Sequence, residues 1–193
     1  MSCDVLTSGR NKPCKDAVGG IRKIHFADFG AMGTVTMDSS TAATSDNIDN
    51  MSGDVSNELE YHTYDVKGNS SLETNIQTSI ENGTTFFEQT LNVTLHKLTG
   101  ADNKEIKLLA FARPHIFVET FDGKVFCVGR EHGAECTGGT AVTGTAMGDL
   151  QGYTLTFVAN EVTLPNELNG ATSANPFAGM STLTASASTA RTP

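Results

Sequence analysis

The residues best suited to hold a metal ion lie between positions 127 and 136. Cys127, His132 and Cys136 offer two thiolates and an imidazole, and the carboxylate of Glu131 lies beside them. Zinc accepts such ligands, but a structural site uses four of them, and the usual close pairing of cysteines is missing. The same residues would serve a small hydrolase or a redox protein. We expect them to be ordinary hairpin residues, and the chain to need no metal and no cofactor.

Catalytic motifs are also missing from the sequence. It contains no Walker-type phosphate loop, no Gly-x-Ser-x-Gly elbow, no His-Glu-x-x-His and no Cys-x-x-Cys. The five histidines are scattered, and none has a neighbouring Ser/His/Asp or Cys/His arrangement. The sequence therefore predicts a protein that is not an enzyme.

The four cysteines fall into two local groups. Cys3 lies near Cys14 in the sequence, and Cys127 lies near Cys136. Four cysteines allow three pairings, and the sequence does not choose among them. All four are disulfide candidates in an oxidising environment. In a reducing one they would be free thiols that behave as small apolar residues.

Composition indicates which elements must position these residues. The chain has 193 residues, a size that suits one domain, and includes 26 threonines and 19 glycines. Threonine favours pleated, half-buried strands, so β structure is favoured over a helical bundle. The net charge of −9 argues against a surface that binds nucleic acid, because phosphate binding depends on clustered Lys and Arg. Apolar runs fall far short of the ~20 residues of a bilayer span, so no membrane partner is expected.

The charges are unevenly placed along the chain. Five of the thirteen basic residues lie between Arg10 and Lys23, and none follows until Lys67. The stretch between them carries acids from Asp28 to Asp65. A basic leader and an acidic stretch could attract successive copies head to tail. The alternative is a solvated loop whose acids do nothing specific.

Strands are predicted where apolar and polar residues alternate. The clearest covers 84–98, in which Leu91 and Val93 point to one side and the polar residues between them to the other. Turn sequences such as Asn82-Gly83 join neighbouring strands. The predicted strands are 21–29, 34–37, 58–67, 71–80, 84–98, 115–120, 124–129, 134–142 and 153–162.

Three further segments complete the predicted organisation. Asp102 and Glu105 resemble a capping box, which predicts a short helix over about 103–112. The polar stretch 38–57 is predicted to be one long loop, a feature that is usually functional or disordered. Residues 181–193 form a low-complexity Ser/Thr/Ala extension that composition predicts to be disordered.

Together these patterns predict a single, mainly β domain over residues 1–180. Its expected architecture is two packed antiparallel sheets in a sandwich or barrel-like arrangement. One short α-helix flanks the sheets, a long loop joins two strands, and the termini are extended.

Three stretches give the sequence a family resemblance. Residues 14–21 read Cys-Lys-Asp-Ala-Val-Gly-Gly-Ile, residues 81–91 read Glu-Asn-Gly-Thr-Thr-Phe-Phe-Glu-Gln-Thr-Leu, and residues 144–157 read Gly-Thr-Ala-Met-Gly-Asp-Leu-Gln-Gly-Tyr-Thr-Leu-Thr-Phe. With the order of elements, they resemble the tail tube proteins of tailed bacteriophages, from about Cys3 to Gly179. These motifs are structural signatures and bind no cofactor, so they indicate a family better than a mechanism.

The resemblance implies a structural subunit of a phage virion, assembled in the host cytoplasm. In such proteins hexameric rings join their sheets into a continuous inner barrel and stack into a tube that carries double-stranded DNA during ejection. The main partner would be the chain itself, with tail sheath, baseplate and tape-measure proteins as further candidates. DNA would pass through without specific binding. The sequence does not decide between a contractile and a non-contractile tail, although general likeness favours the contractile case.

Two sets of residues follow from this resemblance. An acidic wall would repel DNA, because each phosphate contact adds affinity and slows passage. The candidates for this lining are Asp28, Glu58, Glu60, Asp65, Glu73, Glu81 and Glu88. The long loop would reach the next subunit or ring. Its candidate contact residues are Asp38, Asp46, Ile48, Asp49, Met51, Asp54 and Val55.

A second class of function stays open, that of a carbohydrate- or receptor-binding β-sandwich of a virion. Such modules are also rich in Thr and Gly, but they normally expose aromatic rings that stack on sugars. The chain has no Trp and three Tyr, at Tyr61, Tyr64 and Tyr153, which gives this alternative little support.

Overall fold

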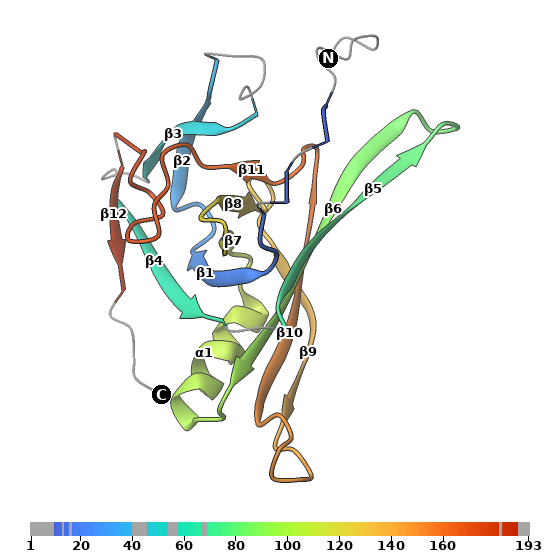
Figure 1. The fold of residues 1–193 in the computed structure, drawn as a ribbon, viewed down its shortest axis with the longest axis vertical. Coiled ribbons are helices and arrows are strands. Elements are labelled where there is room, and N and C mark those ends of the chain that lie inside the picture. The colour runs from blue at the N-terminus through green and yellow to red at the C-terminus, as the bar shows by residue number, and fades with distance from the viewer. Residues whose placement is uncertain are drawn as a thin grey trace.

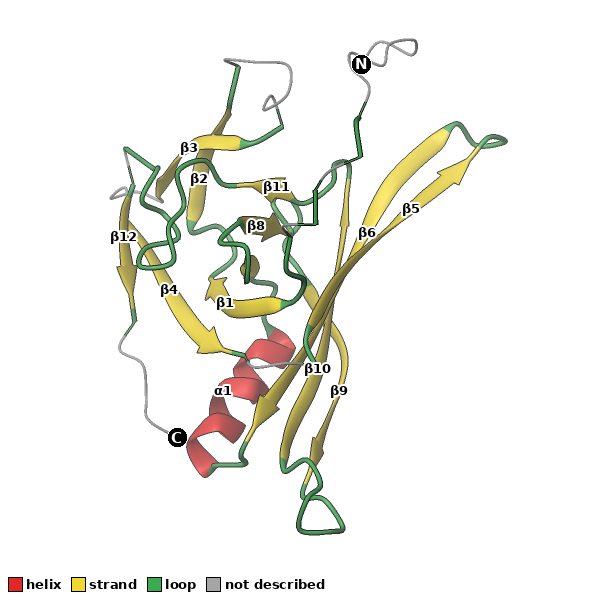
Figure 2. Ribbon diagram, viewed as in Figure 1, coloured by secondary structure: helices red, strands yellow, loops and turns green. Residues whose placement is uncertain are grey.

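Strands dominate the structure, which is a computed structural model of the chain (Figures 1 and 2). It describes residues 10–12, 14–15, 17–39, 46–53, 58–66, 69–181 and 183–188. Within these residues the strands form three sheets, and one helix accompanies them. The sequence-based prediction of a mainly β fold with packed sheets is confirmed.

The largest sheet has six strands in the order β11-β8-β7-β1-β4-β12. Every neighbouring pair is antiparallel except β12, which runs parallel to β4. The strands are β1 (Ile21–Ala27), β4 (Glu58–Asp65), β7 (His115–Thr120), β8 (Val125–Val128), β11 (Asn166–Glu167) and β12 (Thr184–Ala187).

The second sheet has four longer strands in the order β5-β6-β10-β9, all antiparallel. They are β5 (Ser71–Ser79), β6 (Thr84–His96), β9 (Glu135–Val142) and β10 (Gly152–Glu161). Figure 1 shows them running side by side along one flank of the molecule. A two-stranded sheet pairs β2 (Met32–Met37) with β3 (Ile48–Gly53).

The main core lies between the six-stranded and four-stranded sheets. It brings together Ile24 and Ile116 from the six-stranded sheet with Leu91 and Phe157 from the four-stranded sheet, all four fully buried. Alternation along β6 and β10 produces this packing, because every second side chain of a strand points to the same face. The predicted strand 84–98 therefore buries the face that its sequence indicates.

A second core covers the other face of the six-stranded sheet. Phe117 of β7 and Leu59 of β4 are fully buried there against Ile48 and Met51 of β3. Phe177, from the segment that follows β11, packs edge-on against Phe117, with 4.8 Å between the ring centroids. The central strands β1, β7 and β8 of the six-stranded sheet are therefore buried on both faces.

The helix α1 spans Gly100–Phe111 and lies beside the four-stranded sheet (Figure 1). Its N-cap is Thr99, so the predicted cap at Asp102 is wrong. The Thr99 hydroxyl accepts from the Asp102 N–H and donates to the Asp102 carboxylate. Both residue types can cap a helix, and Thr99 takes the role because the helix begins a turn earlier than predicted.

Two segments that were predicted to lack regular structure contain strands. Within the predicted loop 38–57, residues 48–53 form β3 and pair with β2. Within the predicted disordered tail, residues 184–187 form β12 beside β4. Both strands are short. β12 pairs with β4, which is distant along the chain, whereas β3 pairs with β2, the strand that precedes it.

Among the described residues, no helix combines the length and the apolar character needed to cross a membrane.

Candidate assembly surface

The four-stranded sheet has one face that the protein core does not cover, here called the polar face. On β6, Leu91 and Val93 are buried while Asn92 between them is exposed. The strand register places one cross-strand row of Ser71, Asn92 and Thr156 on this face and a second row of Glu73, Thr90 and Val158. The same register continues this face through Asn75, Gln77, Ser79, Thr84, Phe86, Glu88, Thr94, His96, Glu135, Gly138, Thr140, Val142, Gly152, Thr154 and Asn160.

Side-chain hydrogen bonds tie the strands together across the polar face. The Thr156 hydroxyl donates to Asn92 Oδ1 at 3.0 Å, and the hydroxyls of Thr140 and Thr154 are 2.6 Å apart. Nearer the tip of the β5–β6 hairpin, Gln77 Nε2 donates to Glu88 Oε2 at 3.3 Å. Such cross-strand pairs stabilise a sheet whose face is exposed to solvent.

The charge of the four strands is entirely negative or neutral. All of their residues are described, and they include no Lys and no Arg. Glu73, Glu88 and Glu135 are the acids of the polar face. Glu135 was not among the predicted acids, because its orientation depends on a bulge between Thr156 and Phe157 that the sequence does not reveal.

The two outer strands of this sheet, β5 and β9, each pair with one neighbour among the described residues. Because every pair in the sheet is antiparallel, β5 and β9 run in opposite directions. A β9 edge placed beside the β5 edge of another copy would therefore continue the antiparallel pattern. Unpaired edges of this length are a template for pairing with another chain.

The β5–β6 hairpin extends away from the rest of the protein (Figure 1). It carries three exposed apolar side chains, Ile76, Ile80 and Phe86. On the opposite side of the sheet, a groove of about 440 Å³ separates α1 from β9 and is lined by Ile106, Cys136 and Tyr153 among others. Tyr153 closes one part of it by donating a hydrogen bond to Asn103 Oδ1 at 2.6 Å.

The structure divides the predicted lining acids among several places. Glu73 and Glu88 lie together on the polar face, on adjacent strands. Glu81 lies in the turn between β5 and β6. The other four belong to the six-stranded sheet or its connections: Asp28 follows β1, and Glu58, Glu60 and Asp65 lie on β4.

The predicted loop contacts are also divided. Ile48 and Met51 are buried in the chain's own second core, so their side chains are not exposed to a neighbouring subunit. Asp38 and Asp49 accept hydrogen bonds from Asn169 Nδ2, and the Asp46 carbonyl accepts from Asn166 Nδ2. Asp54 and Val55 lie outside the described residues.

The three described cysteines are free thiols, so the local pairing of Cys127 with Cys136 does not form. Cys127 packs in the second core, whereas Cys136 packs against the main core, so the six-stranded sheet lies between them. Burial raises the pKa of the Cys127 thiol to about 12. Cys14 is exposed, and Cys3 lies outside the described residues.

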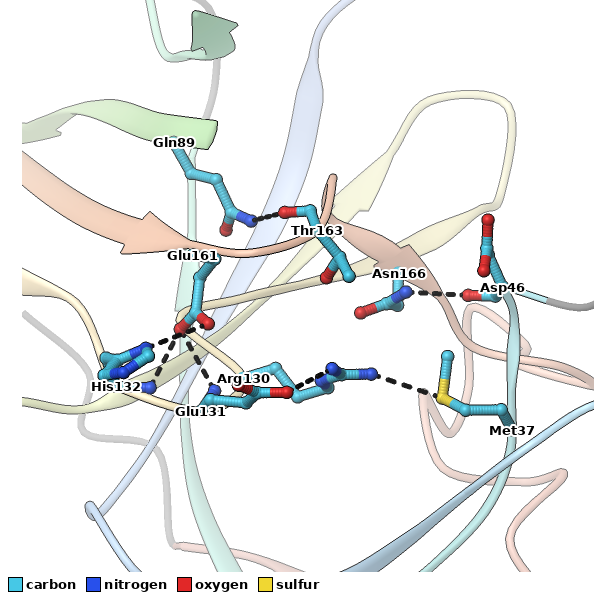
Figure 3. A network of polar contacts seen from close by, with 9 residues as sticks. All are labelled: Met37, Asp46, Gln89, Arg130, Glu131, His132, Glu161, Thr163 and Asn166. Carbon is cyan, nitrogen blue, oxygen red and sulfur yellow. Dashed lines mark hydrogen bonds and ion pairs between the residues drawn. The ribbon is translucent and has the colours of Figure 1, made fainter. Parts of the chain in front are cut away.

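The candidate zinc ligands Cys127, His132 and Cys136, which were expected to be ordinary hairpin residues, do not form one cluster among the described residues. Neither cysteine joins His132. Instead, Glu131 and His132 meet Glu161, which lies at the end of β10 (Figure 3).

Comparison of the chain with protein-family models, with curated proteins and with solved structures gives no match.

Proposed function

We propose that the chain is a structural subunit that assembles through its four-stranded sheet into a tube, as the tail tube proteins of bacteriophages do. The proposal is carried by two observations on this sheet. Its outer strands β5 and β9 each have one partner among the described residues, and its four strands include no Lys or Arg. The resemblance of the sequence to that family supports the same function.

Closure of the sheet between copies would remove its exposed edges. Pairing of β9 with β5 of the next copy extends one antiparallel sheet from subunit to subunit, and a ring leaves no edge free. A hexameric ring of four-stranded sheets contributes about 24 strands. At a spacing of about 4.8 Å and a tilt of about 40°, such a barrel is roughly 50 Å across between backbones.

A barrel of that width leaves room for DNA if its polar face lines the channel. A DNA duplex is much narrower than this barrel and would pass with water around it. Glu73, Glu88 and Glu135 would repel the phosphates, and no Lys or Arg of the four strands would hold them. The acidity of the chain then serves transport of DNA and not binding of DNA.

Proline substitutions on β5 test the role of the sheet edge. Adjacent residues of an edge strand direct their N–H groups alternately towards the neighbouring strand and away from it. Of Asn75→Pro and Ile76→Pro, one therefore removes an outward N–H and keeps the pairing with β6. That variant should stay folded and fail to assemble in sedimentation velocity, whereas Asn75→Ala should assemble normally. Assembly of both proline variants at the wild-type concentration would refute edge pairing.

Charge reversal tests the lining. Assembled tubes that carry Glu73→Lys and Glu88→Lys should retain double-stranded DNA at low salt and release it as salt rises, because phosphate contacts are salt-dependent. Glu60→Lys is the matched control, since Glu60 is an exposed acid of the six-stranded sheet. If the Glu60 variant retains DNA and the double variant does not, the channel is lined by the six-stranded sheet, which would contradict the proposal.

A further inference from the structure

A buried carboxylate lies where the two large sheets are joined. The Glu161 side chain is 1% exposed, and it ends β10 in the four-stranded sheet. Its Oε1 accepts hydrogen bonds from the backbone N–H groups of Glu131 and His132, at 3.0 and 2.9 Å. Those two residues belong to the connection between β8 of the six-stranded sheet and β9 of the four-stranded sheet.

The negative charge of Glu161 has no Lys or Arg partner among the described residues. Its side-chain neighbour is His132, whose Nδ1 is 3.3 Å from Glu161 Oε2. A buried carboxylate is strongly disfavoured unless a cation or a full set of hydrogen bonds compensates for it. The two backbone N–H groups satisfy one oxygen, which leaves the second oxygen to an imidazole that carries a charge only when it is protonated.

The Glu131 carboxylate lies close to His132 and Glu161 and offers a third ligand atom. One oxygen or nitrogen each from Glu131, His132 and Glu161 lies within 4.8 Å of the others (Figure 3). A zinc ion needs ligand distances of about 2.0 to 2.2 Å. Glu131 and His132 have side chains that are 44% and 62% exposed, so they can rotate the remaining distance without disturbing the core.

The turn that carries these two ligands is fixed in place. Gly129 and Gly133 both have positive φ, and a Cβ at either would meet backbone atoms at less than 3 Å. The Gly129 N–H donates to Gln89 Oε1, and the Gly129 carbonyl accepts from His115 Nδ1 at 2.7 Å. A turn held this way presents Glu131 and His132 to Glu161 without a further ordering cost.

An outer partner also orients Glu131. Arg130 Nη2 is 2.5 Å from Glu131 Oε1, and Arg130 Nη1 contacts Met37 Sδ at 3.4 Å (Figure 3). Because Arg130 engages one carboxylate oxygen, the other is available to a metal. Hydrogen bonds from outer residues commonly hold metal ligands in this manner.

We propose that Glu131, His132 and Glu161 form a binding site for a divalent transition-metal ion such as zinc, with water completing the coordination. One imidazole nitrogen and two carboxylates suit zinc better than magnesium or calcium, which prefer oxygen ligands alone. The bound ion clamps the β8–β9 connection to the end of β10 and thereby ties the two sheets together. The site is independent of tube assembly.

Zinc titration of the metal-free protein tests this site. Isothermal calorimetry would be run on protein freed of metal with a chelator, in a background with Cys3→Ser and Cys14→Ser that removes the exposed thiol Cys14 together with Cys3. We expect one zinc ion per chain and a higher melting temperature, because a ligand that binds only the folded state stabilises it. Magnesium at the same concentration should have no effect.

Variants separate this site from adventitious binding. His132→Ala and Glu131→Gln change exposed side chains and should each weaken zinc binding by about tenfold or more, with the fold intact by circular dichroism. His62→Ala, an exposed histidine on β4, is the matched control and should bind as the wild type does. The proposal is overturned if no saturable binding occurs, or if His132→Ala and Glu131→Gln bind zinc as tightly as the wild type.

Discussion

The two large sheets of this protein differ in how their faces are used. In the six-stranded sheet, β7 is buried at five consecutive positions, because cores lie against both faces. In the four-stranded sheet, β10 alternates between buried residues and residues that are partly or fully exposed. One sheet forms the interior of the subunit, and the other presents a surface.

This difference suggests separate roles: the six-stranded sheet mainly stabilises the subunit, and the four-stranded sheet is available for assembly. The six-stranded sheet, whose central strands are covered on both faces, contributes more of the buried apolar residues than the four-stranded sheet does. Burial of apolar surface is the main favourable term in folding. The four-stranded sheet has one solvent-exposed face, and its outer strands have one partner each among the described residues. It contributes less to the stability of the subunit and leaves hydrogen-bonding groups available to another copy. Substitutions in the two sheets should therefore have different consequences, and the following predictions run from the largest effect to the smallest.

Truncation of Phe117 should cause the largest loss of stability. Its ring is fully buried in the second core, on the six-stranded sheet. Phe117→Ala should lower the free energy of unfolding by about 3 to 5 kcal/mol, because it leaves a cavity. Ile76→Ala, on the exposed hairpin of the four-stranded sheet, should change it by less than about 0.5 kcal/mol. Urea denaturation measures both, and equal losses would contradict the division between the sheets.

Acid should destabilise the six-stranded sheet through His25. Burial, with a contribution from Lys23 and against the effect of Asp65, lowers the His25 pKa from 6.5 to about 4. The unfolded chain then takes up a proton at a higher pH than the folded chain does. Stability is therefore complete above pH 6.5 and falls as the pH drops towards 4, by about 3 kcal/mol from this group.

His25→Phe should remove that part of the acid sensitivity, measured by urea denaturation at pH 7 and pH 4.5. The control His62→Ala should keep the wild-type dependence, because His62 is exposed on β4. If His25→Phe loses as much stability between these pH values as the wild type, burial of His25 is not the cause.

Two adjacent glycines on β9 should respond differently to the same substitution. A Cβ at Gly139 would meet the Thr154 carbonyl at 2.7 Å and Leu155 Cδ2 at 2.8 Å, whereas a Cβ at Gly138 meets nothing within 4 Å. Gly139→Ala should therefore cost about 1 to 3 kcal/mol, through overpacking. Gly138→Ala should be neutral or slightly stabilising. Thermal melts would distinguish them, and a reversed order would mean that the edge strand packs differently.

Loss of the helix cap should have the smallest effect. Thr99→Ala removes the acceptor of the Asp102 N–H and should lower stability by about 1 kcal/mol. Thr99→Ser keeps the hydroxyl and should stay close to the wild type. Chemical denaturation of the two variants measures the difference, and an equal loss in both would point to the lost methyl group as the cause.

The sequence predicted the long strands well and the short ones poorly. Alternation identified β6 and β10 because each buries one complete face. β3 and β12 were missed because their residues are mostly small or polar, and they become strands only through β2 and β4. Such pairing within the folded chain overrides local preference.

The same limit applies to the candidate sites. Sequence proximity grouped His132 with Cys127 and Cys136, yet strand alternation places the two cysteines in different cores. Glu161, which completes the cluster with His132, is 29 residues away and was not predicted. Glu73 and Glu88 share a face because β5 and β6 form a hairpin, a proximity that a turn sequence can indicate. Their place in an assembly depends on neighbouring copies.

Electron microscopy of concentrated protein tests the central claim most directly. Edge pairing through the four-stranded sheet predicts stacked rings with an open channel, in which the polar face of β5, β6, β10 and β9 lines the inside. Filaments without a channel, or rings with the six-stranded sheet on the inner wall, would contradict the proposed role.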